Sequence, residues 1–362
     1  MDLRTYSLEE LEEYLTPLFV NPGSTLSLSP LRLQSYLNNP RGDKEDVVLF
    51  EMHHDHQLVG FRTLLPDLFY DREGVPQRFA WLSGNWVHPQ MRRKGISTRL
   101  LQEAEKKWDG RLMYTNYAPD SRALYDHTGR FRVIASRPGR RYYLRSNVEE
   151  LLGSRVNMPG LLRWSDRAVN RTREQKLKGL RFTLQGSCMA EPRSEPSSEM
   201  EQVISRLQQN SLFRRDTDLF MWAIRNPWVT DKVRAPLSYP FSCHSKKFEN
   251  IFFEYRYGET GSRGMLWLMI HNRAISVPYL FAEDNRLIRE MALTLLQTMI
   301  DRGCTHTTIR HAELNRHLVE FKKKFLYSKK MPQLIFAHRD LAASVPQGSL
   351  IHDGDGDVMF TG

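Results

Sequence analysis

The chain has 362 residues, of which 40% are hydrophobic and 26% charged, a composition that is typical of a folded chain and excludes a disordered one. No apolar run approaches the roughly 20 residues that span a bilayer, and the first residues lack the basic and apolar regions of a signal peptide. We therefore expect a cytoplasmic protein without a membrane partner. The net charge of +10 suits a partner rich in phosphate, either a nucleic acid or a phosphorylated small ligand.

The first part of the chain alternates helix-like and strand-like segments. Its hydrophobic periodicity predicts helices at residues 7–19 and 30–37, strands at 46–54, 57–66 and 79–89, a helix at 97–108, a strand at 111–117, a helix at 121–129, and a hairpin at 131–146 that turns at Pro138 and Gly139. This order implies an α/β fold with a mixed sheet and helices on its faces.

A basic helix at residues 162–181 and a linker rich in Pro, Ser and Glu at 190–198 follow. The helix is interpreted as a solvated connector, and nucleic-acid binding through it is kept only as an alternative, because no known nucleic-acid-binding motif accompanies it. From residue 199 the order of strands and helices repeats that of the first part, which indicates a degenerate duplication. The predicted units are residues 1–146, a connector at 147–198, and residues 199–362.

The segment from Trp86 to Leu101, WVHPQMRRKGISTRLL, passes from a strand through a basic turn into a helix. Backbone N–H groups at the start of such a helix converge at the positive end of its dipole, and Gly95 lets the chain approach a ligand without a Cβ atom. This arrangement favours a bound pyrophosphate. The alternative is an ordinary basic turn that opens a solvated helix.

Two motifs carry a resemblance to a known family. VHPQMRRKGIS resembles the acyl-CoA loop of the GNAT superfamily of N-acetyltransferases, V-x-P-x-x-[RQ]-x-x-G-[IVL]-[GA], with Ser97 where Gly or Ala is usual. SRALYDHTGRF is similar to the later family motif A-x-x-L-Y-x-x-x-G-F, with Ser121 in the Ala position and Arg130 inserted before the Phe. The resemblance covers residues 1–146 directly and the second part by topology only, and it implies two GNAT-like acyl-CoA N-acyltransferase domains.

The resemblance also implies roles for individual residues. A backbone N–H of Trp86 or Val87 would polarise the thioester carbonyl, the amides from Arg93 to Ser97 would hold the pyrophosphate, and Tyr125 would protonate the departing thiolate as general acid. The alternative for Tyr125 is a core position. The expected acyl-CoA-binding residues are Trp86, Val87, Arg92, Arg93, Lys94, Gly95, Ile96, Ser97 and Ser121.

The general base is harder to assign, because the strand at residues 79–89 contains no carboxylate. Ser83 and Asn85 are expected to hold a water that relays the proton of the amine, while Glu51 and Asp67 are more remote candidates. His88 is expected to point away from the cleft.

The region of the second part that corresponds to the basic turn reads PYLFAEDNRLIREMA. It has no glycine, and Glu283 and Asp284 would repel a phosphate, so this copy is expected not to bind acyl-CoA and instead to close the acceptor cleft or mediate association. Asp353, Asp355 and Asp357 near the C-terminus are reminiscent of the start of a calcium loop, but the loop is incomplete. A solvated or docking tail is favoured there, and no metal is expected.

The sequence thus predicts an N-acetyltransferase that uses acetyl-CoA and a small amine acceptor, such as an amino sugar or an amino acid. An inactive acyl-CoA-binding module and an enzyme that acetylates a protein amine are the alternatives. Nucleic acid is not an expected partner, and a homodimer is left open.

Overall fold

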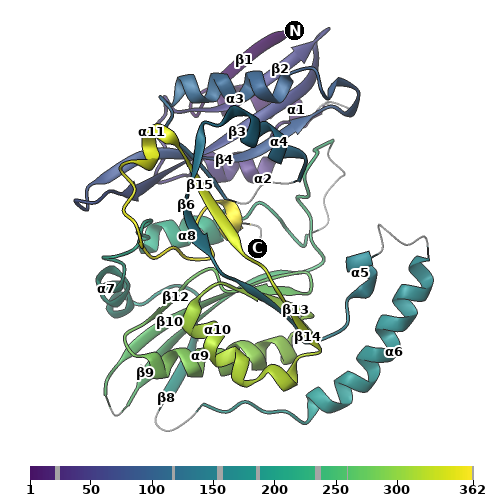
Figure 1. Ribbon diagram of the computed structural model, residues 1–362, viewed down its shortest axis with the longest axis vertical. Helices are drawn as coiled ribbons and strands as arrows, with labels where there is room; N and C mark the ends of the chain where they lie inside the picture. Colours follow the sequence, from purple (N-terminus) through teal and green to yellow (C-terminus); the bar gives the residue numbers. More distant parts are fainter. Residues whose placement is uncertain are drawn as a thin grey trace.

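The computed structural model describes residues 1–20, 25–115, 119–152, 158–184, 188–232, 238–258 and 260–360, without the side chains of residues 119–123, 150 and 159. Within these residues two mixed β-sheets lie one above the other, each flanked by helices (Figure 1). No helix in this described part is long and apolar enough to cross a membrane. The α/β fold with two mixed sheets confirms the fold class that the sequence predicts.

The first sheet has seven strands. Their order is β1 (Asp2–Ser7), β2 (Val47–His54), β3 (Gln57–Tyr70), β4 (Pro76–Val87), β5 (Leu112–Thr115), β15 (Gln333–His338) and β6 (Phe131–Arg137). Successive strand residues face opposite sides, so that Leu49 packs with α1 (Leu11–Phe19) and α2 (Pro30–Leu37), whereas Phe50 packs with α3 (Ile96–Lys107). The short helices η1 (Pro89–Met91) and α4 (Pro119–Thr128) flank α3 in the sequence.

The second sheet has eight strands. Their order is β14 (Tyr327–Lys330), β7 (Arg140–Tyr143), β13 (His306–Ile309), β11 (Ala274–Ser276), β10 (Arg263–His271), β9 (Phe248–Tyr257) and β8 (Cys188–Arg193), with β12 (Leu280–Ala282) also paired to β10. Helices α9 (Asn285–Asp301) and α10 (Ala312–Glu320) pack on one face of this sheet and supply most of the helical residues of the hydrophobic cluster there. The remaining helices are α5 (Val148–Leu152), α6 (Pro159–Lys178), α7 (Ser198–Leu207), α8 (Thr217–Arg225), η2 (Lys322–Lys324), α11 (Arg339–Ala342) and η3 (Asp357–Phe360).

A two-stranded ribbon joins the sheets. Strand β6 pairs with β15 in the first sheet, and the same two chain segments pair again as β7 and β14 in the second sheet (Figure 1). At the crossing the N–H of Met331 donates to the carbonyl of Gly139, and a Cβ on Gly139 would lie 2.4 Å from the Met331 carbonyl oxygen. Only glycine allows this approach.

The ribbon corrects the hairpin predicted at Pro138 and Gly139. These residues do not reverse the chain, because the strands on either side of them belong to different sheets and pair with residues 327–338 instead. Three strands also lie where no strand was predicted: β1 before the predicted helix at residues 7–19, β8 at the linker, and β14 between α10 and β15. Each is an added strand at one end of its sheet, and its short polar sequence carries little alternation.

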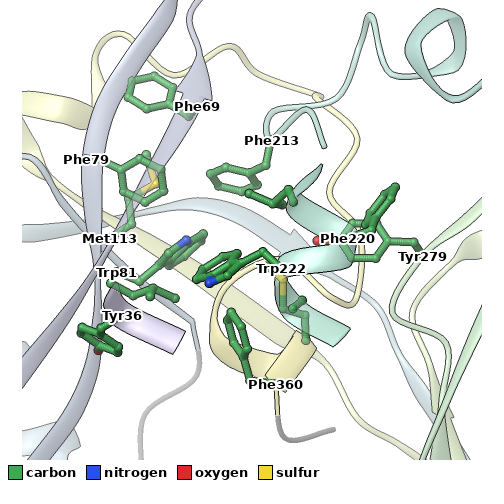
Figure 2. Packing of buried hydrophobic residues seen from close by; sticks show 14 of the residues in the cluster. Tyr36, Phe69, Phe79, Trp81, Met113, Phe213, Phe220, Trp222, Tyr279 and Phe360 are labelled. Atoms are coloured by element: carbon green, nitrogen blue, oxygen red, sulfur yellow. The ribbon is translucent and has the colours of Figure 1, made fainter. Parts of the chain in front are cut away.

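A large aromatic core fills the space between the two halves. It joins Trp81 and Phe79 of the first sheet to Phe213, to Phe220 and Trp222 of α8, and to Phe360 of η3 (Figure 2). The boundaries at residues 146 and 199 stay a prediction, because each sheet also contains a strand from the other half of the chain.

Candidate functional site

Strands β4 and β5 separate at the centre of the first sheet. Their parallel pairing covers only Ala80 and Trp81, opposite Leu112 and Met113. Residues 82–87 of β4 continue along β3 alone, up to the pair between Val87 and Gly60. Within the described residues, the backbone groups of this stretch that face β5 therefore have no strand partner, and they can pair with an extended ligand that lies between the strands.

A β-bulge shapes the same stretch of β4. Arg62 pairs with Asn85 and Leu64 with Leu82, so that Thr63 faces both Ser83 and Gly84. The hydroxyl of Thr63 accepts a 2.8 Å hydrogen bond from the N–H of Gly84. The extra residue interrupts the strict alternation of side chains just beyond the last pair between β4 and β5.

The basic turn after β4 leads into a helix start whose first amides are uncapped. Arg93 and Gly95 have positive φ angles of 62° and 76°, and α3 begins directly after Gly95 with no acidic residue in its first turn. Among the described residues, none accepts a hydrogen bond from the amides of residues 96–98. These amides and the exposed side chains of Arg92, Arg93 and Lys94 suit a phosphate group.

Two residues hold this helix start against the sheet. Ile96 is only 3% exposed, and its Cγ2 atom lies 2.7 Å from the position that a Cβ on Gly60 would take, so β3 and α3 are in close contact. The hydroxyl of Ser97 is 3.5 Å from the side-chain amide of Asn85. Ser97 therefore fits into the turn while its side chain faces β4.

Tyr125 lies at the end of α4 against the α3 face of the sheet. Its ring stacks on Tyr114 at a centroid distance of 4.2 Å, and its hydroxyl accepts a 3.1 Å hydrogen bond from the buried guanidinium of Arg62. Tyr125 is 7% exposed and therefore occupies a core position, which was the alternative interpretation of this residue. Its role as general acid stays a prediction. The side chain of Ser121, in the same helix, lies outside the described residues.

The two residues expected to share a relay water have different partners. Ser83 accepts a 2.6 Å hydrogen bond from Arg32 of α2, whereas Asn85 approaches Ser97 of α3. Because α2 and α3 pack on opposite faces of the sheet, the structure does not bring Ser83 and Asn85 together.

Ser83 has a second partner that the sequence did not indicate. Its hydroxyl donates a 2.6 Å hydrogen bond to the carboxylate of Asp357 in η3. Both residues border a cavity of about 180 Å³. The cavity is lined by Ser29, Arg32, Ser83, Gly84, Trp228, Tyr239, Phe241, Ser242 and Asp357. A carboxylate among aromatic rings at the bulge of β4 can bind an amine and accept its proton.

Arg32 organises the floor of this cavity. It is 5% exposed, its guanidinium lies 3.9 Å from the ring centre of Trp228, and it donates to the hydroxyls of Thr63 and Ser83. The cation therefore holds the Ser83 oxygen while the Ser83 proton points to Asp357.

Buried ion pairs hold the C-terminal segment in place. Arg215, with a fully buried side chain, bonds Asp67 at 2.6 Å and Asp355 at 3.1 Å, and the hydroxyl of Tyr279 also donates to Asp355. A Cβ on Gly356 would lie within 4 Å of both Thr115 and Trp81. Thus η3 sits where β4 and β5 separate.

The C-terminal acidic residues are therefore docked, and the alternative of a solvated tail is wrong for Asp355, which is 2% exposed. Asp353 also makes a 2.7 Å ion pair with Arg137. The alternating acidic residues are visible in the sequence, but the neighbouring residues do not indicate which distant groups they bind.

The remote candidates for the general base are engaged elsewhere. Asp67 accepts hydrogen bonds from Arg215 and from the indole of Trp81, and Glu51 accepts a 2.6 Å hydrogen bond from Tyr14. The Nδ1 atom of His88 accepts a 3.4 Å hydrogen bond from the N–H of Gln90 in its own turn. These contacts leave Asp357 as the carboxylate at the bulge.

One carboxylate caps the corresponding helix start in the second half, and a second carboxylate lies directly before it. Asp284 accepts a 2.8 Å hydrogen bond from the N–H of Arg286, and Glu283 accepts one of 2.7 Å from the N–H of Arg263. An anion would meet negative charge here, which supports the expectation that this copy does not bind acyl-CoA.

Comparison with known proteins places these features in context. Residues 8–129 match the model of the acetyltransferase (GNAT) family. No curated protein sequence matches the chain. A conserved protein of Enterococcus faecalis V583 with the description probable N-acyltransferase aligns over 94% of this chain and 73% of its own, with 11% identity and a TM-score of 0.53.

N-myristoyltransferase of Saccharomyces cerevisiae, solved with bound myristoyl-CoA, aligns over 99% of this chain and 87% of its own, with 12% identity and a TM-score of 0.52. At these identities the likeness shows the fold alone, and it extends over both sheets.

Proposed function

We propose that this chain, whose residues 8–129 match the model of the acetyltransferase (GNAT) family, transfers an acetyl group from acetyl-CoA to the primary amine of a small acceptor, such as an amino sugar or an amino acid. The observation that carries this proposal is the uncapped start of α3 beside the separated strands β4 and β5. The two features suit the two ends of one ligand, a pyrophosphate and an amide-containing arm.

The residues that would hold acyl-CoA fit its chemistry. The amides from Arg93 to Ser97 would bind the pyrophosphate, with Arg92 and Lys94 adding positive charge, and the unpaired backbone of β4 would pair with the amides of the pantetheine arm. The N–H of Trp86 or Val87 would stabilise the oxyanion that develops on the thioester carbonyl. Fixing both reactants in one cleft supplies much of the rate.

Two residues on opposite sides of the sheet would carry out the two proton transfers. The acceptor amine would lie in the cavity at the bulge, where the carboxylate of Asp357 takes its proton either directly or through the Ser83 hydroxyl. Tyr125 would give a proton to the departing thiolate. The amine nitrogen thereby forms the new C–N bond as the C–S bond breaks.

The size of the cavity supports a small acceptor. About 180 Å³ lined by the rings of Trp228, Tyr239 and Phe241 holds a single sugar or amino-acid unit rather than a long chain. The carboxylate of Asp357 attracts the ammonium form of such an amine before it is deprotonated.

Titration calorimetry of the purified chain with acetyl-CoA tests the first half of the proposal. We expect saturable binding, and its absence up to millimolar ligand would overturn an acyl-CoA-dependent function. Myristoyl-CoA serves as the comparison, and tighter binding of the longer acyl group would contradict the assignment of acetyl.

A screen of amines with detection of the released thiol tests the second half. We expect turnover with at least one amino sugar or amino acid. Binding of acetyl-CoA without turnover of any small amine would instead favour an inactive binding module, and turnover only with a peptide N-terminus would favour acetylation of a protein amine.

A further inference from the structure

Helix α6 (Pro159–Lys178) lies along the side of the molecule at some distance from the proposed site (Figure 1). One side of it is anchored. Asp166 accepts a 2.6 Å hydrogen bond from the Ser146 hydroxyl and others from the amides of Val148 and Glu149, and Leu177 is fully buried in the second core. The opposite side of α6 is open to solvent.

Large apolar side chains lie on the open side. Trp164 is 67% exposed and Leu161 is 55% exposed, although both are of types that soluble proteins usually bury. With the exposed Ala168 they are spaced three and four residues apart and so form one stripe along the helix. Met158, 56% exposed, lies directly before the helix.

A row of arginines runs beside this stripe. Arg163, Arg167 and Arg171 are exposed and four residues apart, so their side chains follow one line on the helix surface. Arg163 pairs with Glu149, whereas no ion pair is found for Arg167 or Arg171 within the described residues. The helix therefore presents an apolar stripe and a positive row on the same open side.

We propose that this face, made of Leu161, Trp164, Ala168 and the three arginines, docks the protein on an anionic lipid surface. The arginines would contact lipid phosphates, and the indole and leucine side chains would enter the boundary between headgroups and acyl chains. The contact is peripheral, since no described helix can span a bilayer. This proposal departs from the expectation of no membrane partner. The sequence does not reveal that these apolar side chains are exposed, whereas the folded structure does.

The apolar stripe favours lipid over nucleic acid. A nucleic acid would be held by the arginines, but it offers no apolar layer for Leu161 and Met158, whereas a bilayer takes both kinds of side chain. This inference does not depend on the proposed acetyl transfer.

Sedimentation of the full chain with vesicles tests the proposal. We expect binding to vesicles of equal parts phosphatidylglycerol and phosphatidylcholine, and little binding to phosphatidylcholine alone. L161S/W164S should weaken binding about tenfold or more, because the two apolar side chains that would be buried in the lipid are lost. R167E/R171E should weaken it similarly. V319S/L326S removes two exposed apolar side chains elsewhere and should bind like the wild type.

Fluorescence quenching by brominated phosphatidylcholine, mixed into the same anionic vesicles, gives a second measurement. Trp164 is the exposed member of the seven tryptophans, so wild-type emission should be quenched and that of W164F should not. Equal binding of the L161S/W164S variant, or quenching that persists in W164F, would overturn the proposal. So would binding of an RNA or DNA duplex that depends on Arg167 and Arg171 when vesicles do not bind.

Discussion

The hydroxyl of Ser83 donates a 2.6 Å hydrogen bond to the carboxylate of Asp357, although the two residues are 274 positions apart. Ser83 lies on the central strand of the first sheet and Asp357 in the last helix of the described chain. The contact gives the strand bulge a carboxylate that its own sequence lacks, and it makes the C-terminal segment part of the proposed site.

Asp357→Asn tests this contact in catalysis. The amide keeps the shape of the side chain but cannot accept the proton of the amine, so kcat should fall about a hundredfold while the affinity for acetyl-CoA stays unchanged. Steady-state rates of thiol release measure this. Asp340→Asn, at a carboxylate that is 78% exposed, should keep the wild-type rate.

The single variant Ser83→Ala separates relay from direct transfer. If the proton passes through Ser83, then Ser83→Ala should lower kcat about as much as Asp357→Asn, and the double variant should cost little more, because all of these changes break one path. If the proton passes directly to Asp357, then Ser83→Ala should keep most of the wild-type rate. A wild-type rate for Asp357→Asn would remove this carboxylate from the mechanism.

Tyr125→Phe tests the general acid. The ring would keep its stack on Tyr114, but the thiolate would lose its proton donor, so kcat should fall about a hundredfold with little change in acetyl-CoA affinity. Calorimetry and turnover on the same preparation give the two values. An unchanged rate would leave Tyr125 with its packing role alone.

Gly95→Ala tests the proposed binding of the pyrophosphate at the start of α3. A Cβ on Gly95 would meet no atom within 4 Å, so the cost arises from the positive φ of 76° and not from a clash. We expect the start of α3 to shift and acetyl-CoA affinity to fall about tenfold.

Gly348→Ala is the matched control for this change. Its φ is 77°, and a Cβ there would also meet no atom within 4 Å. It should lower the free energy of unfolding to a similar extent and leave acetyl-CoA affinity unchanged. Equal losses of affinity in both variants would show that Gly95 acts only through stability.

Arg215→Met tests the buried ion network. The change would leave Asp67 and Asp355 in the core without their shared cation, and we expect the free energy of unfolding to fall by about 3 to 5 kcal/mol. Denaturant unfolding measures it. Glu191→Gln, which breaks the exposed pair with Arg193, should cost less than about 1 kcal/mol.

Because His352 is buried, we expect the free energy of unfolding to fall in mild acid. Burial lowers its pKa to about 3, whereas in the unfolded chain it would bind a proton below about pH 6.5. The unfolded state therefore gains protons first as the pH falls, and the free energy of unfolding decreases by about 1.4 kcal/mol per pH unit for this group. Burial lowers the pKa of His311 as well, which adds to the slope.

His352→Gln should remove one part of this slope, and urea unfolding at about pH 6 and about pH 4 measures the difference. His54→Gln changes an exposed histidine and should keep the wild-type slope. A slope in His352→Gln equal to that of the wild type would contradict the assignment.

Local sequence determined the elements around the basic turn that is proposed to bind acyl-CoA. The apolar periodicity of β2, β3, β4 and α3, and the glycine that turns between β4 and α3, can be read from neighbouring residues because each element is built from contacts a few positions apart. For the same reason the sequence already names the expected phosphate-binding residues, and Asp284, whose carboxylate caps the start of α9.

Tertiary structure decided what depends on distant partners. The strands on either side of Gly139 looked like a hairpin, yet they pair with residues 327–338 across both sheets. Asp357 looked like part of a polar tail, yet the pairs of Arg215 and Asp355 place it at Ser83. Pairing partners and buried charge contacts are selected by the whole packed core, so no short window of sequence contains them, and the carboxylate of the proposed site came from the far end of the chain.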